Sequence, residues 1–177
     1  MRSFLLSAVA IGVLSAAVPA LAQTPPAATG ATTGAPLFDP MFQDHAVLQR
    51  GRPITVWGRA APGAAVSVSL DQVQVQTTAD ASGAWRAALP TLTAGGPYVL
   101  AARSGGTAQS VSDVMVGDVW LCSGQSNMEF AVRQATNADS EIAGANDPNL
   151  RLFLVGRSSL PAPSAAPRAV GQWRTTS

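Results

Sequence analysis

The sequence has no lysine, one cysteine and one histidine. A lone cysteine, Cys122, excludes an internal disulfide, and its position in an apolar run is typical of a small buried residue. Because the chain has no cluster of Cys and His residues, it offers no zinc-type site, and we expect neither a metal nor another cofactor. The eleven basic residues are all arginines and nearly balance ten carboxylates. Such a chain lacks the basic surface that nucleic acids and anionic membranes attract, so neither is expected as a partner.

Long apolar runs are also missing after the N-terminal segment. Phe4–Val18 is apolar, follows Arg2, and leads into Ala20-Leu21-Ala22, which fits the small-x-small rule for signal cleavage. A membrane-spanning helix needs about 20 apolar residues, so this shorter run favours a Sec-type signal peptide at residues 1–22 over a membrane anchor. Cleavage after Ala22 would leave a periplasmic or secreted protein with ten arginines against ten carboxylates.

The next two segments differ sharply in pattern. Residues 23–36 are rich in Pro, Ala, Thr and Gly and carry no charge, which predicts a flexible linker. Residues 37–112 alternate apolar and polar side chains in short runs, with turn signals about every 8–12 residues, which predicts an antiparallel β-sandwich domain. Strands are expected at residues 54–59, 65–70, 73–76, 84–89 and 97–102.

Three aromatic residues lie in these expected strands. Trp57, Trp85 and Tyr98 are either a platform for binding sugar or members of the core. Aromatic side chains are common in strands, which favours the core.

After Asp113 the pattern changes again. Val114–Cys122 is apolar on both faces, as in a strand of a parallel sheet. Helices are expected at Asn127–Ala135 and, more weakly, at 140–145, a second strand at 150–155 and a loop at 161–167. Strand, helix and strand open an α/β fold, yet two strands bury too little apolar surface to offset chain entropy. We therefore expect a two-part α+β chain in which residues 113–177 are the incomplete start of an α/β domain.

Ser126 has two interpretations. With Glu129 it forms the Ser-x-x-Glu pattern of a capping box at a helix start. It also follows a buried strand through Gly124, and a strand-turn-helix places a side chain at the sheet edge where α/β proteins bind ligands. The N–H groups and positive dipole of the helix start would suit a developing oxyanion. The two roles are compatible, and the residues alone leave both open.

The segment GDVWLCSGQSNMEF, residues 117–130, resembles the first catalytic block of the sialate O-acetylesterase family, a branch of the SGNH hydrolases. Gly124–Met128 differs from the G-x-S-x-G elbow of α/β-hydrolases and is fairly specific for carbohydrate esterases of the SGNH type. The resemblance covers roughly residues 36–155. Upstream segments match in the family's order: Phe42–Arg50, Trp57-Gly58, Ala61–Gly63, Gly83–Arg86 and Leu89–Tyr98.

The resemblance implies a β-rich domain beside an SGNH-type α/β domain, and removal of O-acetyl groups from sialic acids or related sugars by serine acyl transfer. It implies that Ser126 is the nucleophile and that its backbone N–H is one oxyanion-hole donor. The remaining hole donors, and the Asp-x-x-His segment that carries the base, belong to later blocks that residues 1–177 lack. His45 matches a family position without a catalytic role, so a structural or surface role is expected.

A serine hydroxyl without a base is a weak nucleophile, so residues 1–177 alone are expected to have little or no esterase activity. One alternative is an acetylxylan or other polysaccharide deacetylase on the same scaffold. Another is a secreted β-sandwich that binds carbohydrate without catalysis, and a third is a truncated product that does not fold stably. The substrate-binding residues and the oligomeric state stay open.

Overall fold

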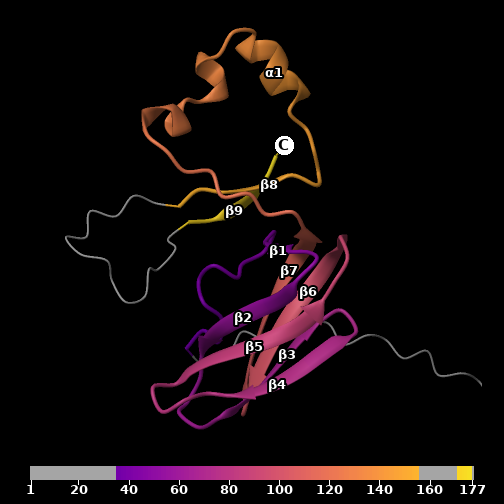
Figure 1. The fold of residues 1–177 in the computed structure, drawn as a ribbon, viewed down its shortest axis with the longest axis vertical. Helices are drawn as coiled ribbons and strands as arrows, with labels where there is room; N and C mark the ends of the chain where they lie inside the picture. Colours follow the sequence, from indigo (N-terminus) through magenta and orange to yellow (C-terminus); the bar gives the residue numbers. More distant parts are fainter. Residues whose placement is uncertain (1–34, 156–170, 177) are drawn as a thin grey trace, which may run out of the picture.

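The computed structural model describes residues 35–155 and 171–176 (Figure 1). The expected signal peptide at residues 1–22, the expected linker up to residue 34 and the expected loop at 161–167 lie outside the described residues. Within the part that is described, no helix has both the length and the apolar character needed to cross a membrane.

Residues 37–117, called here the β-rich part, form two sheets. A five-stranded sheet has the order β1-β7-β6-β3-β4, and β2 pairs with β5 in a second, two-stranded sheet. All pairs are antiparallel except β1 with β7, which is parallel, so the larger sheet is mixed and the expectation of a purely antiparallel domain is wrong at this edge. The strands are β1 Val47–Gln49, β2 Pro53–Arg59, β3 Ala65–Leu70, β4 Val73–Thr78, β5 Ala84–Thr91, β6 Gly95–Ser104 and β7 Thr107–Gly117.

Alternating burial explains these strands. In β3, Val66, Val68 and Leu70 are buried while the serines between them are partly exposed. Apolar side chains of β2 and β5 join those of the larger sheet in one hydrophobic cluster, so the two sheets share a core (Figure 1). Each fully buried aliphatic side chain stabilises the fold by about 1.5–3 kcal/mol relative to exposure. All five strands expected from alternation are confirmed as β2 to β6.

The aromatic residues of this part also pack inward. Trp85 is 3% exposed and donates its indole N–H to the carbonyl oxygen of Leu37, at 3.1 Å. Trp57 is half-buried, and its ring and that of Phe42 form a T-shaped pair at a centroid distance of 4.7 Å. Tyr98 is half-buried against the same core. The expectation that these aromatic side chains belong to the core is confirmed.

Residues 118–155 and 171–176, called here the C-terminal part, carry little regular structure (Figure 1). The expected strand at Val114–Cys122 is wrong: its first four residues belong to β7, and its last residues are exposed outside any strand. A strand that is apolar on both faces needs a covering layer on each side and neighbours to pair with. The described residues supply none around Trp120 and Leu121, which are 85% and 90% exposed.

The helix expected at Asn127–Ala135 is replaced by two short 3₁₀ helices, η1 Ser126–Glu129 and η2 Val132–Gln134. Neither buries a residue, and a short helix without tertiary packing is marginal. The weaker helix is confirmed as α1, Ala138–Gly144. The last expected strand forms as β8, Arg151–Phe153, but it pairs antiparallel with β9, Trp173–Thr175.

Candidate functional site

Ser126 is the first residue of η1 and is exposed. The preceding Gln125 has extended backbone, and its carbonyl accepts the N–H of Met128 at 2.9 Å, which closes the 3₁₀ turn. Gly124 lets this turn stay tight, because a Cβ there would lie 2.9 Å from the Met128 side chain. The sequence thus places the Ser126 hydroxyl on a sharp turn, directly after an extended stretch and open to solvent.

The capping role, one of the two interpretations of Ser126, is not what the structure shows. Gln125, rather than Ser126, is the residue that precedes the helical turn, and no side-chain capping hydrogen bond forms at η1. The first N–H groups of a helix have no acceptor within that helix, and the Ser126 N–H is one of these at η1. The helix behind it has only four residues, so its dipole is much smaller than the expected longer helix would give.

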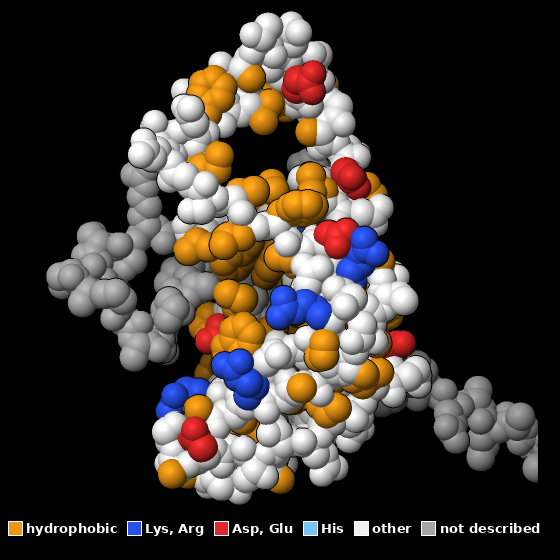
Figure 2. All heavy atoms as spheres, viewed as in Figure 1, with side chains coloured by type: hydrophobic (Ala, Val, Ile, Leu, Met, Phe, Trp, Pro, Cys, Tyr) orange, Lys and Arg blue, Asp and Glu red, His pale blue; other side chains and the backbone are white. Residues whose placement is uncertain are grey.

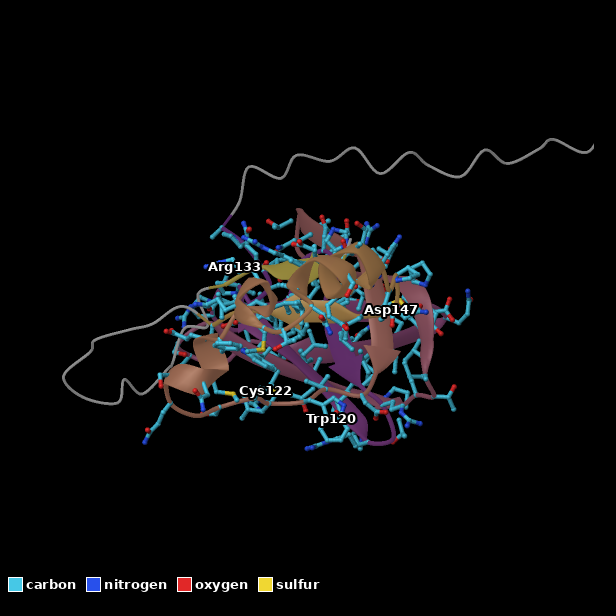
Figure 3. All side chains as sticks on the ribbon, turned by 90° about the horizontal axis from the view of Figure 1, so that it is seen from above. Trp120, Cys122, Arg133 and Asp147 are labelled. Carbon is cyan, nitrogen blue, oxygen red and sulfur yellow. The ribbon has the colours of Figure 1, made fainter. Side chains whose placement is uncertain are left out.

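The segment around Ser126 is open to solvent. Residues 118–130 are all exposed. This segment is one limb of an arch, residues 118–150, which also includes η2 and α1 and ends at β8 (Figure 1). Figure 2 shows this arch standing away from the rest of the molecule, with hydrophobic side chains around the opening beneath it. Trp120 and Cys122 lie on the stretch that leads to η1 (Figure 3), so the expectation that Cys122 is buried is wrong.

Two polar links hold the start of this arch to the β-rich part. Arg50 donates two hydrogen bonds to Asp118, from Nε and Nη2, each at 2.9 Å. The hydrogen bond from Arg50 is the main cause that lowers the pKa of the Asp118 carboxyl below its usual value. The backbone N–H of Val119 donates to Gln49 Oε1 at 2.9 Å. Asp118 therefore links the base of the arch to the β-rich part.

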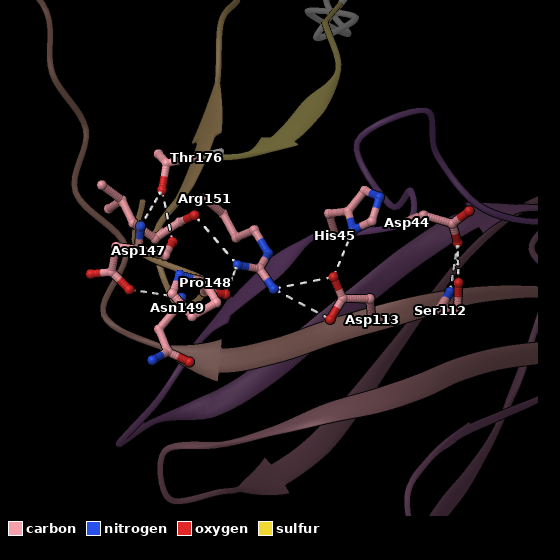
Figure 4. A network of polar contacts seen from close by, with 10 residues as sticks. Asp44, His45, Ser112, Asp113, Asp147, Pro148, Asn149, Arg151 and Thr176 are labelled. Atoms are coloured by element: carbon pink, nitrogen blue, oxygen red, sulfur yellow. Dashed lines mark hydrogen bonds and ion pairs between the residues drawn. The ribbon is translucent and has the colours of Figure 1, made fainter. Parts of the chain in front are cut away.

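The histidine that the sequence provides is engaged elsewhere. His45 lies in the loop before β1, and its Nδ1 is 2.6 Å from Asp113 Oδ2 (Figure 4). Arg151 Nη2 lies 3.1 Å from the same carboxylate oxygen and 3.3 Å from Oδ1. The hydrogen bond from His45, and after it the Arg151 guanidinium, lower the Asp113 pKa against the effect of burial. Among the described residues, no hydrogen bond or ion pair joins His45 to Ser126.

Sequence reasoning missed the pairing of Asp113 with Arg151. The one available signal was a carboxylate directly before the apolar residues that end β7, and it does not point to Arg151. No metal site accompanies this network: in residues 35–155 and 171–176, no group of three or more His, Cys, Asp or Glu side chains could hold an ion.

Comparisons with known proteins find relatives that are much longer than this chain. No protein-family model matches the chain. The sialate O-acetylesterase of Mus musculus is 38% identical over 130 residues, which are 67% of this chain and 24% of that protein. The Homo sapiens sialate O-acetylesterase is 39% identical over 100 residues, 50% of this chain and 19% of that protein. The chain thus spans about a quarter or less of the length of these relatives.

A crystal structure extends the likeness to the fold. The carbohydrate acetylesterase from Xanthomonas citri matches 80% of this chain with a TM-score of 0.75 and 44% sequence identity. The match covers 32% of that protein. Both the sequence and the fold of the described residues therefore correspond to one portion of larger esterases.

Proposed function

We propose that this chain, which belongs to a sialate O-acetylesterase-like family, is the N-terminal part of an exported carboxylic ester hydrolase. The enzyme removes O-acetyl groups from sialic acid or a related sugar. Ser126 is its nucleophile, and the Ser126 backbone N–H is one donor of the oxyanion hole. The observation that carries the proposal is the exposed serine hydroxyl on the tight turn that the Gly124–Met128 sequence forms.

The reaction we propose is acyl transfer in two steps. Ser126 Oγ attacks the acetyl carbonyl as a base takes its proton, and the negative oxygen that develops is held by N–H donors. The sugar hydroxyl leaves with a proton, and water then hydrolyses the acetyl-serine. His45 is held by Asp113, and the resemblance to the sialate O-acetylesterase family implies that the base is a histidine outside residues 1–177.

The exposed apolar side chains of the arch support the proposal that residues 118–177 are part of a larger α/β domain. Trp120 and Leu121 are almost fully exposed, and soluble proteins seldom leave such adjoining large apolar groups uncovered. In the proposal, further strands and helices of the hydrolase domain cover them. We place the boundary between a β-sandwich domain and the hydrolase domain after Gly117 rather than after Ser112, because β7 continues to Gly117. Residues 1–22 are then a signal peptide and residues 23–36 a linker.

A second substrate class has support of its own. The Xanthomonas relative is described as a carbohydrate acetylesterase, without reference to sialic acid, and it is more similar in sequence than the mammalian enzymes are. Acetylated polysaccharides such as acetylxylan therefore remain the alternative substrate. A pure carbohydrate-binding module is less well supported, because Trp85 is buried and Trp57 packs against Phe42 beneath Arg86.

The test compares two polypeptides with their Ser126→Ala variants: residues 1–177, and the longer chain that continues into a complete hydrolase domain. We expect the longer chain to release acetate from O-acetylated sialic acid or acetylxylan, and Ser126→Ala to abolish the release. We expect residues 1–177 to show little or no activity. Release by residues 1–177 that Ser126→Ala removes would show that a base other than the one proposed is at work.

A further inference from the structure

We propose that Asp113 is a positioning residue that fixes the C-terminal part, and with it the Ser126 arch, against the β-rich part. The inference rests on the proposed function for its catalytic consequence and on the contacts of Asp113 for its structural one. Asp113 lies on β7, whereas Arg151, its partner, lies on β8. The pair therefore joins elements on either side of the arch (Figure 4).

A bulge in β7 turns Asp113 out of the sheet. Tyr98 pairs with Val114 and Leu100 pairs with Val111, so two residues of β7, Ser112 and Asp113, face one residue of β6. Asp113 has φ +51°, a left-handed conformation that Asp and Asn tolerate better than most residues. Bulges re-aim side chains, and this one directs the Asp113 carboxylate to the loop before β1 and to Arg151.

Arg151 depends on this carboxylate. Its side chain is 4% exposed, and a buried guanidinium is costly unless a counter-charge and hydrogen bonds compensate it. Its other hydrogen bonds among the described residues go to the neutral backbone carbonyls of Pro148 and Leu150. Within the described ranges, Asp113 is the carboxylate ion-paired with Arg151. Loss of Asp113 would leave a buried cation without its counter-charge.

Neutral hydrogen bonds surround the same junction. Trp173 Nε1 donates to the carbonyl oxygen of Met41 at 3.0 Å. Gln43 Nε2 donates to the carbonyl oxygen of Gly171, also at 3.0 Å. Both involve the loop that holds His45, so the loop, the bulge of β7 and the β8–β9 pair form one junction. Asp113 carries the negative charge at its centre.

The first test is hydrogen exchange on Asp113→Asn, measured by mass spectrometry on the full chain. Asn keeps the size of the side chain and tolerates the left-handed backbone, but it removes the charge. We expect faster deuterium uptake in residues 148–155 and 171–176, with an opening constant larger by about tenfold or more, as expected on loss of a hydrogen bond between charged groups. Peptides from β3 and β6 should exchange as in the unaltered protein. Unchanged uptake at the junction would overturn the proposal.

Asp118→Asn is the matched control. It removes the same charge from a carboxylate that is also bound by an arginine, but both partners of that pair are half exposed. We expect no change in uptake at residues 148–155 and 171–176. A change as large as that of Asp113→Asn would overturn the specific role of Asp113.

Arg151→Met covers the case in which Asp113→Asn fails to fold, because Arg151 lies on β8, outside the five-stranded sheet. The same rise in uptake is expected, and Arg151→Lys, which keeps the charge, should restore part of the protection. If Arg151→Met leaves uptake unchanged, the pair does not hold the junction.

The catalytic consequence is measured on the longer, active polypeptide. Asp113→Asn should lower kcat for acetyl release and leave KM nearly unchanged, because it displaces the nucleophile and does not contact the sugar. Unchanged kcat would overturn the positioning role. If no form of the polypeptide hydrolyses acetyl esters, the proposed function fails, and the exchange experiments still decide whether Asp113 holds the junction.

Discussion

His45 Nδ1 and Asp113 Oδ2 lie 2.6 Å apart, although 68 residues separate them in the chain. Hydrogen bonds from His45 and Arg151 keep the pKa of Asp113 below its usual value, so the carboxylate is ionised near neutral pH and can only accept. The imidazole must therefore donate from Nδ1. This assignment explains why His45 serves the junction between the two parts rather than Ser126.

The proton position of His45 is directly measurable. We expect neutral His45 to carry its proton on Nδ1, because the ionised Asp113 carboxylate accepts from that nitrogen. The chain has one histidine, so two-bond proton–nitrogen correlation spectra of an untagged sample report on it alone. In Asp113→Asn the preference should weaken. A proton found on Nε2 in the unaltered protein contradicts the assignment.

Acid should loosen the junction. The pKa of Asp113 is lowered in the folded protein from its ordinary value of 3.8, so its contribution to stability is complete above that value. The contribution is lost as the pH falls through the lower folded pKa. We expect the indole N–H signal of Trp173, which donates to Met41, to lose protection in that acidic range. In Asp113→Asn the signal should already be weakly protected at neutral pH, and an acid transition equal to that of the unaltered protein would refute this account.

Close packing of backbone at Gly58 makes a strong stability prediction. A Cβ on Gly58 would lie 1.8 Å from the carbonyl oxygen of Leu37, which itself accepts the N–H of Arg59 and the indole of Trp85. Gly58→Ala should lower the free energy of unfolding by about 3 kcal/mol or more, because backbone must shift. Urea unfolding measures the loss.

Gly106→Ala is the control for Gly58→Ala. No heavy atom lies within 4 Å of a Cβ built on Gly106, so its free energy of unfolding should change by less than about 1 kcal/mol. Equal losses in the two variants would mean that the close approach to Leu37 is not what makes Gly58 necessary.

Leu100→Ala tests the shared core of the two sheets. Leu100 is fully buried and lies on β6, so its truncation should cost about 2–5 kcal/mol, the usual range for a buried leucine. Val99→Ala, next to it but 55% exposed, should cost about 1 kcal/mol or less, mainly through strand propensity. Thermal unfolding compares them, and similar losses would contradict the inward orientation of Leu100.

The β-rich part could be read from the sequence because its signals are local. Alternation of apolar and polar residues gave β3 at its observed bounds and β5 to within two residues. β1 has three residues, too few for a period to show. Only the last four residues of β7 were predicted as a strand, because residues 114–117 and the apolar residues after Asp118 resemble one continuous strand in the sequence.

The candidate site was less predictable because it depends on distant contacts. The sequence predicted a strand before Ser126 and a helix after it, yet both elements need apolar partners that residues 118–155 do not find among the described residues. The Asp113–Arg151 pair joins residues 38 positions apart, and no sequence pattern predicts that these two residues pair. Exposed Trp120 and Leu121 remain the clearest sign that this region is built to be covered.

The central claim is that Ser126 is the nucleophile of an acetyl esterase. The most direct test measures acetate release from an O-acetylated sugar by the longer polypeptide and by its Ser126→Ala variant, with circular dichroism to show that both are folded. Because Ser126 is exposed and packs against nothing in the core, the variant should fold normally. We expect its rate to fall by about 10⁴-fold or more. A folded Ser126→Ala variant that releases acetate at the original rate would contradict the account.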